Sequence, residues 1–158
     1  MTFNYALLQE LSETPGIPGR EDLVRERIRA ELDDTAFDVR VDAMGNLIAE
    51  ARGPEGAPKV MISAHMDEIG FIVRHVDDQG FLRLQNLGGF DMRNLFARQV
   101  LVHAHRGGPR IGVLNPATKP VHIASEEDKK KIPSMPDFAV DLGLDAETVK
   151  RECASATW

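Results

Sequence analysis

The sequence has little cysteine, few aromatic residues and no surplus of positive charge. Cys153 is the only cysteine among 158 residues, which excludes an internal disulfide and fits a reducing compartment. Aromatic residues make up 6% of the chain, and 25 acidic residues outnumber 19 basic ones, for a formal net charge of −6. Because nucleic-acid backbones require a basic surface, we expect no nucleic-acid partner.

Long apolar runs are also missing. No stretch approaches the roughly 20 residues that a membrane-spanning helix needs, so we expect no membrane partner. The opening MTFNYALLQELSE carries acids in place of a basic region and has no signal-like apolar run. With the single cysteine, these features favour a cytoplasmic location. The 42% hydrophobic content is enough to bury one ordinary core, or part of a larger one.

Residues 1–70 predict two helices followed by strands. Residues 3–12 space apolar side chains at helical intervals, and TPGIPG then interrupts the pattern. Residues 20–34 have one apolar stripe and one charged face, which is typical of a packing helix. FDVRV and NLIAEA predict strands around the turn AMGN. A third strand is predicted over residues 59–64, and because it is apolar on both faces except at Ser63, we expect it to be a covered, central strand of an α/β sheet.

After Gly70 the sequence changes to short strands separated by turns that contain glycine. FIVRHV, FLRLQNLGG, RQVLVHAH and RIGVLN show no helical pattern, so we expect residues 71–118 to form an inserted small β barrel or sandwich. Residues 119–137 contain prolines and a charged run, which indicates a solvated connector. Residues 138–158 start with the apolar strand FAVD and are predicted to return to the first domain. A final helix follows, with Asp145 as its N-cap.

Ionisable residues follow two of these strands at their carboxyl ends. His65 and Asp67 are two apart, so in a continuing strand both side chains project from one face. Asp67 could then hold the imidazole of His65 in the tautomer and orientation that a divalent metal needs. The same spacing also fits a histidine bonded to a neighbouring acid without any metal, which is the commoner case. Asp141, in DLG, is by itself typical of a turn residue.

Considered together, the two strand ends indicate a shared site. An α/β sheet binds its ligands outside the carboxyl ends of its strands, where His65 and Asp141 both stand if their strands are neighbours. A histidine on one ion and a carboxylate between two ions form half of a two-metal hydrolytic centre. His103 and His105 share a strand face as well, but no acid or third histidine follows closely, and we expect them to bind no metal.

Longer motifs carry a resemblance to a known family. The stretch AHMDEIGFIV, the segments GGFD and RGGPRIGV, and the return KPVHIASEEDKKKIPSMPDFAVDLG resemble the tetrahedral aminopeptidases, metallopeptidase family forty-two. Members are also called glutamyl or deblocking aminopeptidases, and some are labelled endoglucanases. The resemblance covers residues 1 to about 151. It implies an aminopeptidase-type (phosphorylase/hydrolase-like) α/β sheet with an inserted β-barrel dimerisation domain.

The resemblance also implies an activity and a set of site residues. It identifies a metal-dependent aminopeptidase that releases N-terminal residues from peptides and uses two divalent metal ions, zinc or cobalt. By similarity, His65 ligates one ion, Asp67 orients His65, and Asp141 bridges the two ions. In the family the β insertion mediates dimerisation and dimers build a hollow dodecamer, so we expect a homo-oligomer.

Length is the main departure from the family, whose members are more than twice as long. Their general-base glutamate and remaining metal ligands would lie beyond residue 158, and the closing CASATW fits the family pattern poorly. We therefore expect a chain that is interrupted after about Glu152 and inactive alone. The alternative is a non-catalytic interaction fragment that pairs through its β barrel with a full-length relative.

Overall fold

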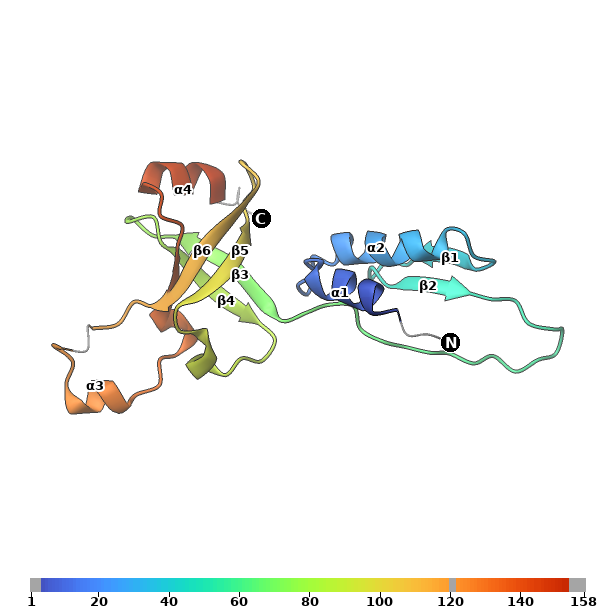
Figure 1. Cartoon of the computed structure of the whole chain (residues 1–158), viewed down its shortest axis with the longest axis horizontal. Helices are drawn as coiled ribbons and strands as arrows, with labels where there is room; N and C mark the ends of the chain where they lie inside the picture. The colour runs from blue at the N-terminus through green and yellow to red at the C-terminus, as the bar shows by residue number, and fades with distance from the viewer. Residues whose placement is uncertain (1–3, 120–121, 154–158) are drawn as a thin grey trace. The chain divides into compact units, whose positions relative to one another are not determined.

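The computed structural model describes residues 4–119 and 122–153. The chain forms two compact units that divide between Ile69 and Gly70. It is a mixed α/β structure whose second unit contains a curled antiparallel sheet (Figure 1). No helix within the described ranges is long and apolar enough to cross a membrane.

Two helices open the first unit, as the sequence predicts. Helix α1 spans Tyr5–Glu13 and helix α2 spans Asp22–Leu32. Asn4 caps α1, because its side-chain oxygen accepts a hydrogen bond from the Leu7 amide at 3.1 Å and so pairs one of the amides that a helix start leaves free. The prolines and glycines of TPGIPG then separate the helices.

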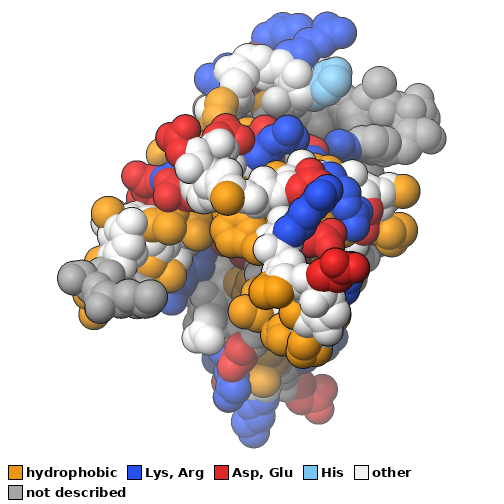
Figure 2. Space-filling view, turned by 90° about the vertical axis from the view of Figure 1, so that its right-hand side faces the viewer, with side chains coloured by type: hydrophobic (Ala, Val, Ile, Leu, Met, Phe, Trp, Pro, Cys, Tyr) orange, Lys and Arg blue, Asp and Glu red, His pale blue; other side chains and the backbone are white. Residues whose placement is uncertain are grey.

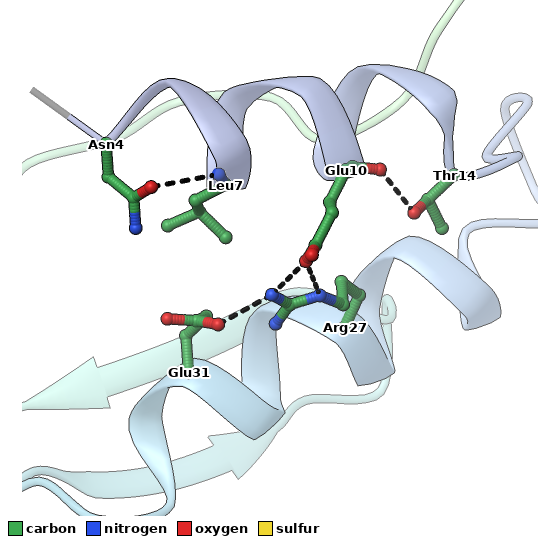
Figure 3. A network of polar contacts seen from close by, with 6 residues as sticks. All are labelled: Asn4, Leu7, Glu10, Thr14, Arg27 and Glu31. Atoms are coloured by element: carbon green, nitrogen blue, oxygen red, sulfur yellow. Dashed lines mark hydrogen bonds and ion pairs between the residues drawn. The ribbon is translucent and has the colours of Figure 1, made fainter.

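Arg27 of α2 joins the two helices. Its Nε donates a hydrogen bond to the Glu10 carboxylate of α1 at 2.7 Å, and its guanidinium lies 2.6 Å from the Glu31 carboxylate one turn further along α2 (Figure 3). Exposed ion pairs stabilise a fold by only about 0–1 kcal/mol. The contact therefore fixes how the helices meet more than it stabilises them.

A β hairpin follows the helices, and it too is predicted. Strand β1 (Asp38–Val41) pairs antiparallel with β2 (Leu47–Glu50). Beyond it, residues 51–69 contain no helix or strand (Figure 1). The strand predicted over residues 59–64 is therefore wrong for this structure. A strand needs a neighbour to take its backbone hydrogen bonds, and the described part of the first unit offers this segment none.

The second unit consists of short strands, as predicted, with small helices between them. Its five strands pair antiparallel in the order β3-β4-β7-β6-β5, with bounds β3 Gly70–Val76, β4 Leu82–Leu87, β5 Arg98–His103, β6 Pro109–Pro116 and β7 Phe138–Asp141. The helical pieces are η1 Met92–Leu95, α3 Glu126–Lys130, η2 Met135–Asp137 and α4 Ala146–Cys153. The charged run predicted as a solvated connector thus contains the short exposed helix α3.

Strand β7 lies at the centre of this sheet. Val140 is opposite Leu82 of β4 on one side and Leu114 of β6 on the other, and all three side chains are buried. The sequence assigns residues 138–158 to the α/β domain, whereas the observed pairing puts β7 with the strands of the predicted insertion. How these units map onto whole domains stays a prediction.

Helix α4 contributes to the core of this unit. Asp145 caps it, as predicted, by accepting a hydrogen bond from the Thr148 amide at 2.9 Å. Val149 and Cys153 are buried with the core residues of the sheet. Burial raises the pKa of the Cys153 thiol, which keeps it in the unreactive thiol form.

Asp77 organises the hairpin that joins β3 to β4. Its carboxylate accepts hydrogen bonds from the amides of Gln79 and Phe81, at 3.0 and 2.9 Å, and from the Arg83 guanidinium at 2.8 Å. Burial raises the pKa of Asp77, but these hydrogen bonds outweigh burial and hold the pKa below its ordinary value. The ionised carboxylate therefore stabilises the folded state.

We expect Asp77→Asn to lower the free energy of unfolding near neutral pH by about 1–2 kcal/mol. The fully exposed neighbour Asp78 gives the matched control, because Asp78→Asn should cost less than about 0.5 kcal/mol. The folded-state pKa of Asp77 is lowered, so its contribution is present above the unfolded-state pKa and is lost as the pH falls through the folded-state pKa. Urea unfolding at neutral and acidic pH measures this. Two results would contradict the role of Asp77: an equal loss of unfolding free energy in Asp77→Asn and Asp78→Asn, or a difference between the wild type and Asp77→Asn that is as large at acidic as at neutral pH.

Candidate metal centre

A single backbone hydrogen bond anchors the chain beside His65. The Glu68 amide donates to the Gly16 carbonyl at 2.8 Å, which ties residues 66–69 to the turn between α1 and α2. Gly16 is itself buried against Val24, where an added Cβ would come within 2.6 Å of the valine side chain. Sequence reasoning missed this support. The only sequence signal for this support is Gly16 in TPGIPG, and a glycine there is equally typical of a helix breaker.

His65 and Asp67 lie together, although not as neighbours on a strand face. Nδ1 of His65 is 2.9 Å from the backbone carbonyl oxygen of Asp67 and 3.3 Å from its carboxylate Oδ1. The sequence places both side chains on one face of a continuing strand, but in the structure they meet across a loop that has no strand geometry. Residues two apart in the sequence can touch in many local backbone conformations. The spacing of His65 and Asp67 therefore predicts their contact correctly, although the predicted strand is wrong.

This arrangement leaves one imidazole nitrogen free for a ligand. When Nδ1 carries the proton and donates it to Asp67, Nε2 presents its lone pair, and the His65 side chain is 84% exposed. That is the donor that a divalent metal ion accepts from histidine. His65 can therefore supply one ligand to a metal ion, and Asp67 is the partner that orients its ring.

Asp141 belongs to the second unit, at the end of β7. Its Oδ1 accepts a hydrogen bond from the Gly143 amide at 2.8 Å, and Gly143 has a φ of +66°, which glycine adopts readily. This is the local bond of an aspartate at a turn, the ordinary alternative for DLG. The side chain remains exposed, with its second oxygen free of any hydrogen bond within the described residues.

A complete metal site is not assembled from the residues that the structure describes. In residues 4–119 and 122–153, no three or more histidine, cysteine, aspartate or glutamate side chains come together in a group that could hold an ion. His103 lies on β5. The described donors thus supply single ligands, and a closed coordination sphere needs further groups.

Comparison with known proteins identifies the family. Residues 45–154 match the family model of the M42 glutamyl aminopeptidases, which is more than half of the chain. The chain therefore belongs to the M42 peptidase family, as the sequence motifs predict.

Individual relatives agree with this membership. The chain is 34% identical to the lysyl aminopeptidase of Pyrococcus furiosus over 94% of its own length and 42% of that protein. Among solved structures it is similar to a TET aminopeptidase from a marine sediment archaeon of the Thaumarchaeota, with a TM-score of 0.83 and 29% identity over 92% of this chain and 40% of that one. It is also similar to the Pyrococcus horikoshii TET1 peptidase, which can assemble into a tetrahedron or a large octahedral shell, with a TM-score of 0.76 and 38% identity over 91% and 42%.

The chain spans about two fifths of the length of the curated relatives that it matches. The matched part includes His65, Asp67 and Asp141. The family implies dependence on a divalent metal ion.

We expect this chain alone to bind zinc or cobalt weakly, through His65. In an NMR titration with Co²⁺, the resonances of residues 64–68 should shift or broaden at metal concentrations in excess of the protein. His65→Ala should remove these changes, while the control His103→Ala should leave them in place. Tight, stoichiometric binding that survives His65→Ala would show that the ligand has been misassigned.

Proposed function

We propose that this chain supplies His65 and its supporting residues to a metal-dependent aminopeptidase that releases N-terminal residues from peptides. The proposal is supported by family membership and by one observation above all, the Nδ1 contact of His65 with Asp67. A histidine held in this way has its free nitrogen fixed in direction before any metal arrives. Peptide substrates and a cytoplasmic location belong to the same proposal.

Two divalent ions, zinc or cobalt, would serve this reaction. When bound, such ions polarise a scissile carbonyl and make water a better nucleophile. The part of this chain in the reaction is to hold and orient the metal ligand His65. With the proton on Nδ1 of His65, the Asp67 carbonyl accepts its hydrogen bond, and the Asp67 carboxylate lies 3.3 Å from the same nitrogen. The Gly16 carbonyl holds the backbone at Glu68.

Asp141 is proposed as the carboxylate that bridges the two ions. Family resemblance supports this role, and the exposed oxygen that makes no turn hydrogen bond leaves room for it. The turn role and the bridging role make different predictions. Removing a bridging ligand abolishes activity, whereas loss of a turn hydrogen bond lowers stability by about 1 kcal/mol and leaves activity intact.

The direct test supplies the rest of the fold in trans. The full chain is co-expressed with the part of the Pyrococcus furiosus lysyl aminopeptidase that lies outside the matched region, and zinc or cobalt is added. We expect hydrolysis of aminoacyl nitroanilides by the complex, and none above the metal blank by this chain alone.

Three variants of the complex assign the roles. His65→Ala should reduce hydrolysis to the blank, and Asp67→Asn should reduce it by roughly 10- to 100-fold. Asp141→Asn should abolish it if the carboxylate bridges the ions, and an active Asp141→Asn complex would refute the bridge. Full activity of the His65→Ala complex would refute the proposed function.

A second candidate function is non-catalytic pairing with another family chain, in a homo-oligomer or with a full-length relative. Strands β3 and β5 form the two edges of the five-stranded sheet. Beside the β5 edge, Leu101, Ile111 and Val113 expose 52%, 67% and 44% of their surfaces. Exposed apolar residues on a sheet with free edges favour association.

We expect the full chain to exceed 17.5 kDa in light scattering. Ile111→Lys should restore the monomer mass, while Val41→Lys in the first unit, at a side chain that is also exposed, should not. A point substitution is the right tool, because removing residues 71–118 would also remove the strands that pair with β7. A strictly monomeric wild-type chain would contradict the pairing surface.

A further inference from the structure

Strand β3 contains an irregularity at Arg74. Val73 is opposite Leu84 of β4. The next registered pair is His75 with Arg83, so Arg74 is an extra residue on β3 that has no partner on β4. This is a β-bulge, which disrupts the alternation of a strand and redirects the side chains beside it.

The sequence VRHV explains why the bulge forms here. In a regular strand, side chains alternate between the two faces, so Val73 and Val76, which are three apart, would point to opposite faces. Both nevertheless pack against the hydrophobic core of the second unit. The extra residue makes this possible, and it leaves Arg74 and His75 exposed between the two valines.

The redirected side chains line an open pocket of about 180 Å³. The residues that line it are Arg74, His75, Arg83, Leu84, Pro136 and Phe138. Drug-sized ligands occupy pockets of roughly 300–1,000 Å³, so this one suits a single small group. Guanidinium groups only donate hydrogen bonds, and an imidazole has a donor as well. The polar part of the pocket is therefore suited to a group that is negatively charged and accepts hydrogen bonds.

The positive charge at this pocket is only partly neutralised. Basic and acidic side chains are interspersed on the face that Figure 2 shows, and ion pairs join such side chains in both units. Arg83 donates to the Asp77 carboxylate through Nε and Nη2, at 3.1 and 2.8 Å, which leaves its Nη1 without a described partner. The side chains of Arg74 and His75 have no hydrogen bond or ion pair with any residue that the structure describes.

The acid nearest to the pocket in the segment 136–138 is also engaged elsewhere. Oδ2 of Asp137 accepts hydrogen bonds from the amide and the hydroxyl of Ser134, at 2.8 and 2.7 Å. Among the described residues, Asp77 is thus the carboxylate that is bonded to the basic side chains of the pocket, and it is bonded to Arg83. The charge of Arg74 remains available to a bound anion.

We propose that this pocket binds a small oxyanion of the phosphate class. The guanidinium fork matches two oxygens of a phosphate group, and such charge-assisted hydrogen bonds are among the strong ones. Donors come from Arg74, His75 and Arg83, and a tetrahedral anion has more oxygens to accept them than a carboxylate has. The anion is either inorganic phosphate or the phosphate group of a small monoester. The proposal does not depend on the proposed function.

The test is an NMR titration of the full chain with inorganic phosphate, glycerol phosphate and acetate, at an ionic strength held constant with sodium chloride. We expect the amides of residues 73–76 and 83–84 to shift and to saturate at millimolar phosphate, and acetate to bind at least about tenfold more weakly. Tighter binding of glycerol phosphate than of inorganic phosphate would identify a phosphomonoester as the ligand, and the reverse order would identify free phosphate. Either order upholds the site.

Substitutions at Arg74 assign the site. Arg74→Gln should weaken phosphate binding at least roughly tenfold, and Arg74→Lys, which keeps the charge without the fork, should give an intermediate affinity. Arg40→Gln is the matched control, because Arg40 is an exposed arginine on strand β1, and it should bind phosphate as the wild type does. All three variants should keep the wild-type midpoint of urea unfolding.

Three results would overturn the oxyanion site. The first is an equal response of the same amides to chloride, which would show screening of charge only. The second is an unchanged phosphate affinity in Arg74→Gln. The third is binding by Arg74→Lys that is no better than that by Arg74→Gln, which would show that the loss comes from a disturbed bulge and not from the lost charge.

Discussion

The second unit depends on one strand that arrives late in the sequence. Without β7, the hairpins β3–β4 and β5–β6 would be separate ribbons, and two-stranded ribbons are marginal in water. Val140 supplies the middle of the row that runs from Leu82 to Leu114, and neighbouring Phe138 is fully buried with them. The long connection through residues 119–137 therefore serves to bring a central strand back to the sheet, and α4 then closes its core.

The first unit has no comparable constraint. Among its described residues, Val24 is the only buried hydrophobic side chain, and it packs against Gly16, whose carbonyl accepts the hydrogen bond from the Glu68 amide. A unit with so small a core gains little free energy from burial. The contrast accounts for the main features of each unit: a packed antiparallel sheet in the second, and in the first a thin layer of helices and hairpin with an apolar segment, Val60 to Ile62, for which the described residues provide no cover.

Local signals in the sequence predict much of this arrangement. The helical stripes, the turn AMGN, the cap at Asp145 and the short strands after Gly70 depend on contacts within a few residues, and each is confirmed. Long-range pairing is where prediction fails. Residues 59–64 have the composition of a central strand, but composition does not supply neighbours.

The sequence of FAVD predicts a strand but does not identify its neighbours. The pairing of β7 with β4 and β6 shows where the strand lies in the sheet. In the candidate site, too, the sequence predicts the local contact but not the long-range one. Spacing finds the contact of His65 with Asp67, whereas the support from Gly16 comes from a residue that looks like a helix breaker.

The central claim is that His65, held at Nδ1 by Asp67, presents Nε2 to a divalent metal ion. The most direct measurement is the zinc affinity of the co-expressed complex, compared between the wild type and His65→Ala. Our account predicts tight binding that His65→Ala weakens by at least about tenfold. Equal zinc affinities in the two complexes would contradict it.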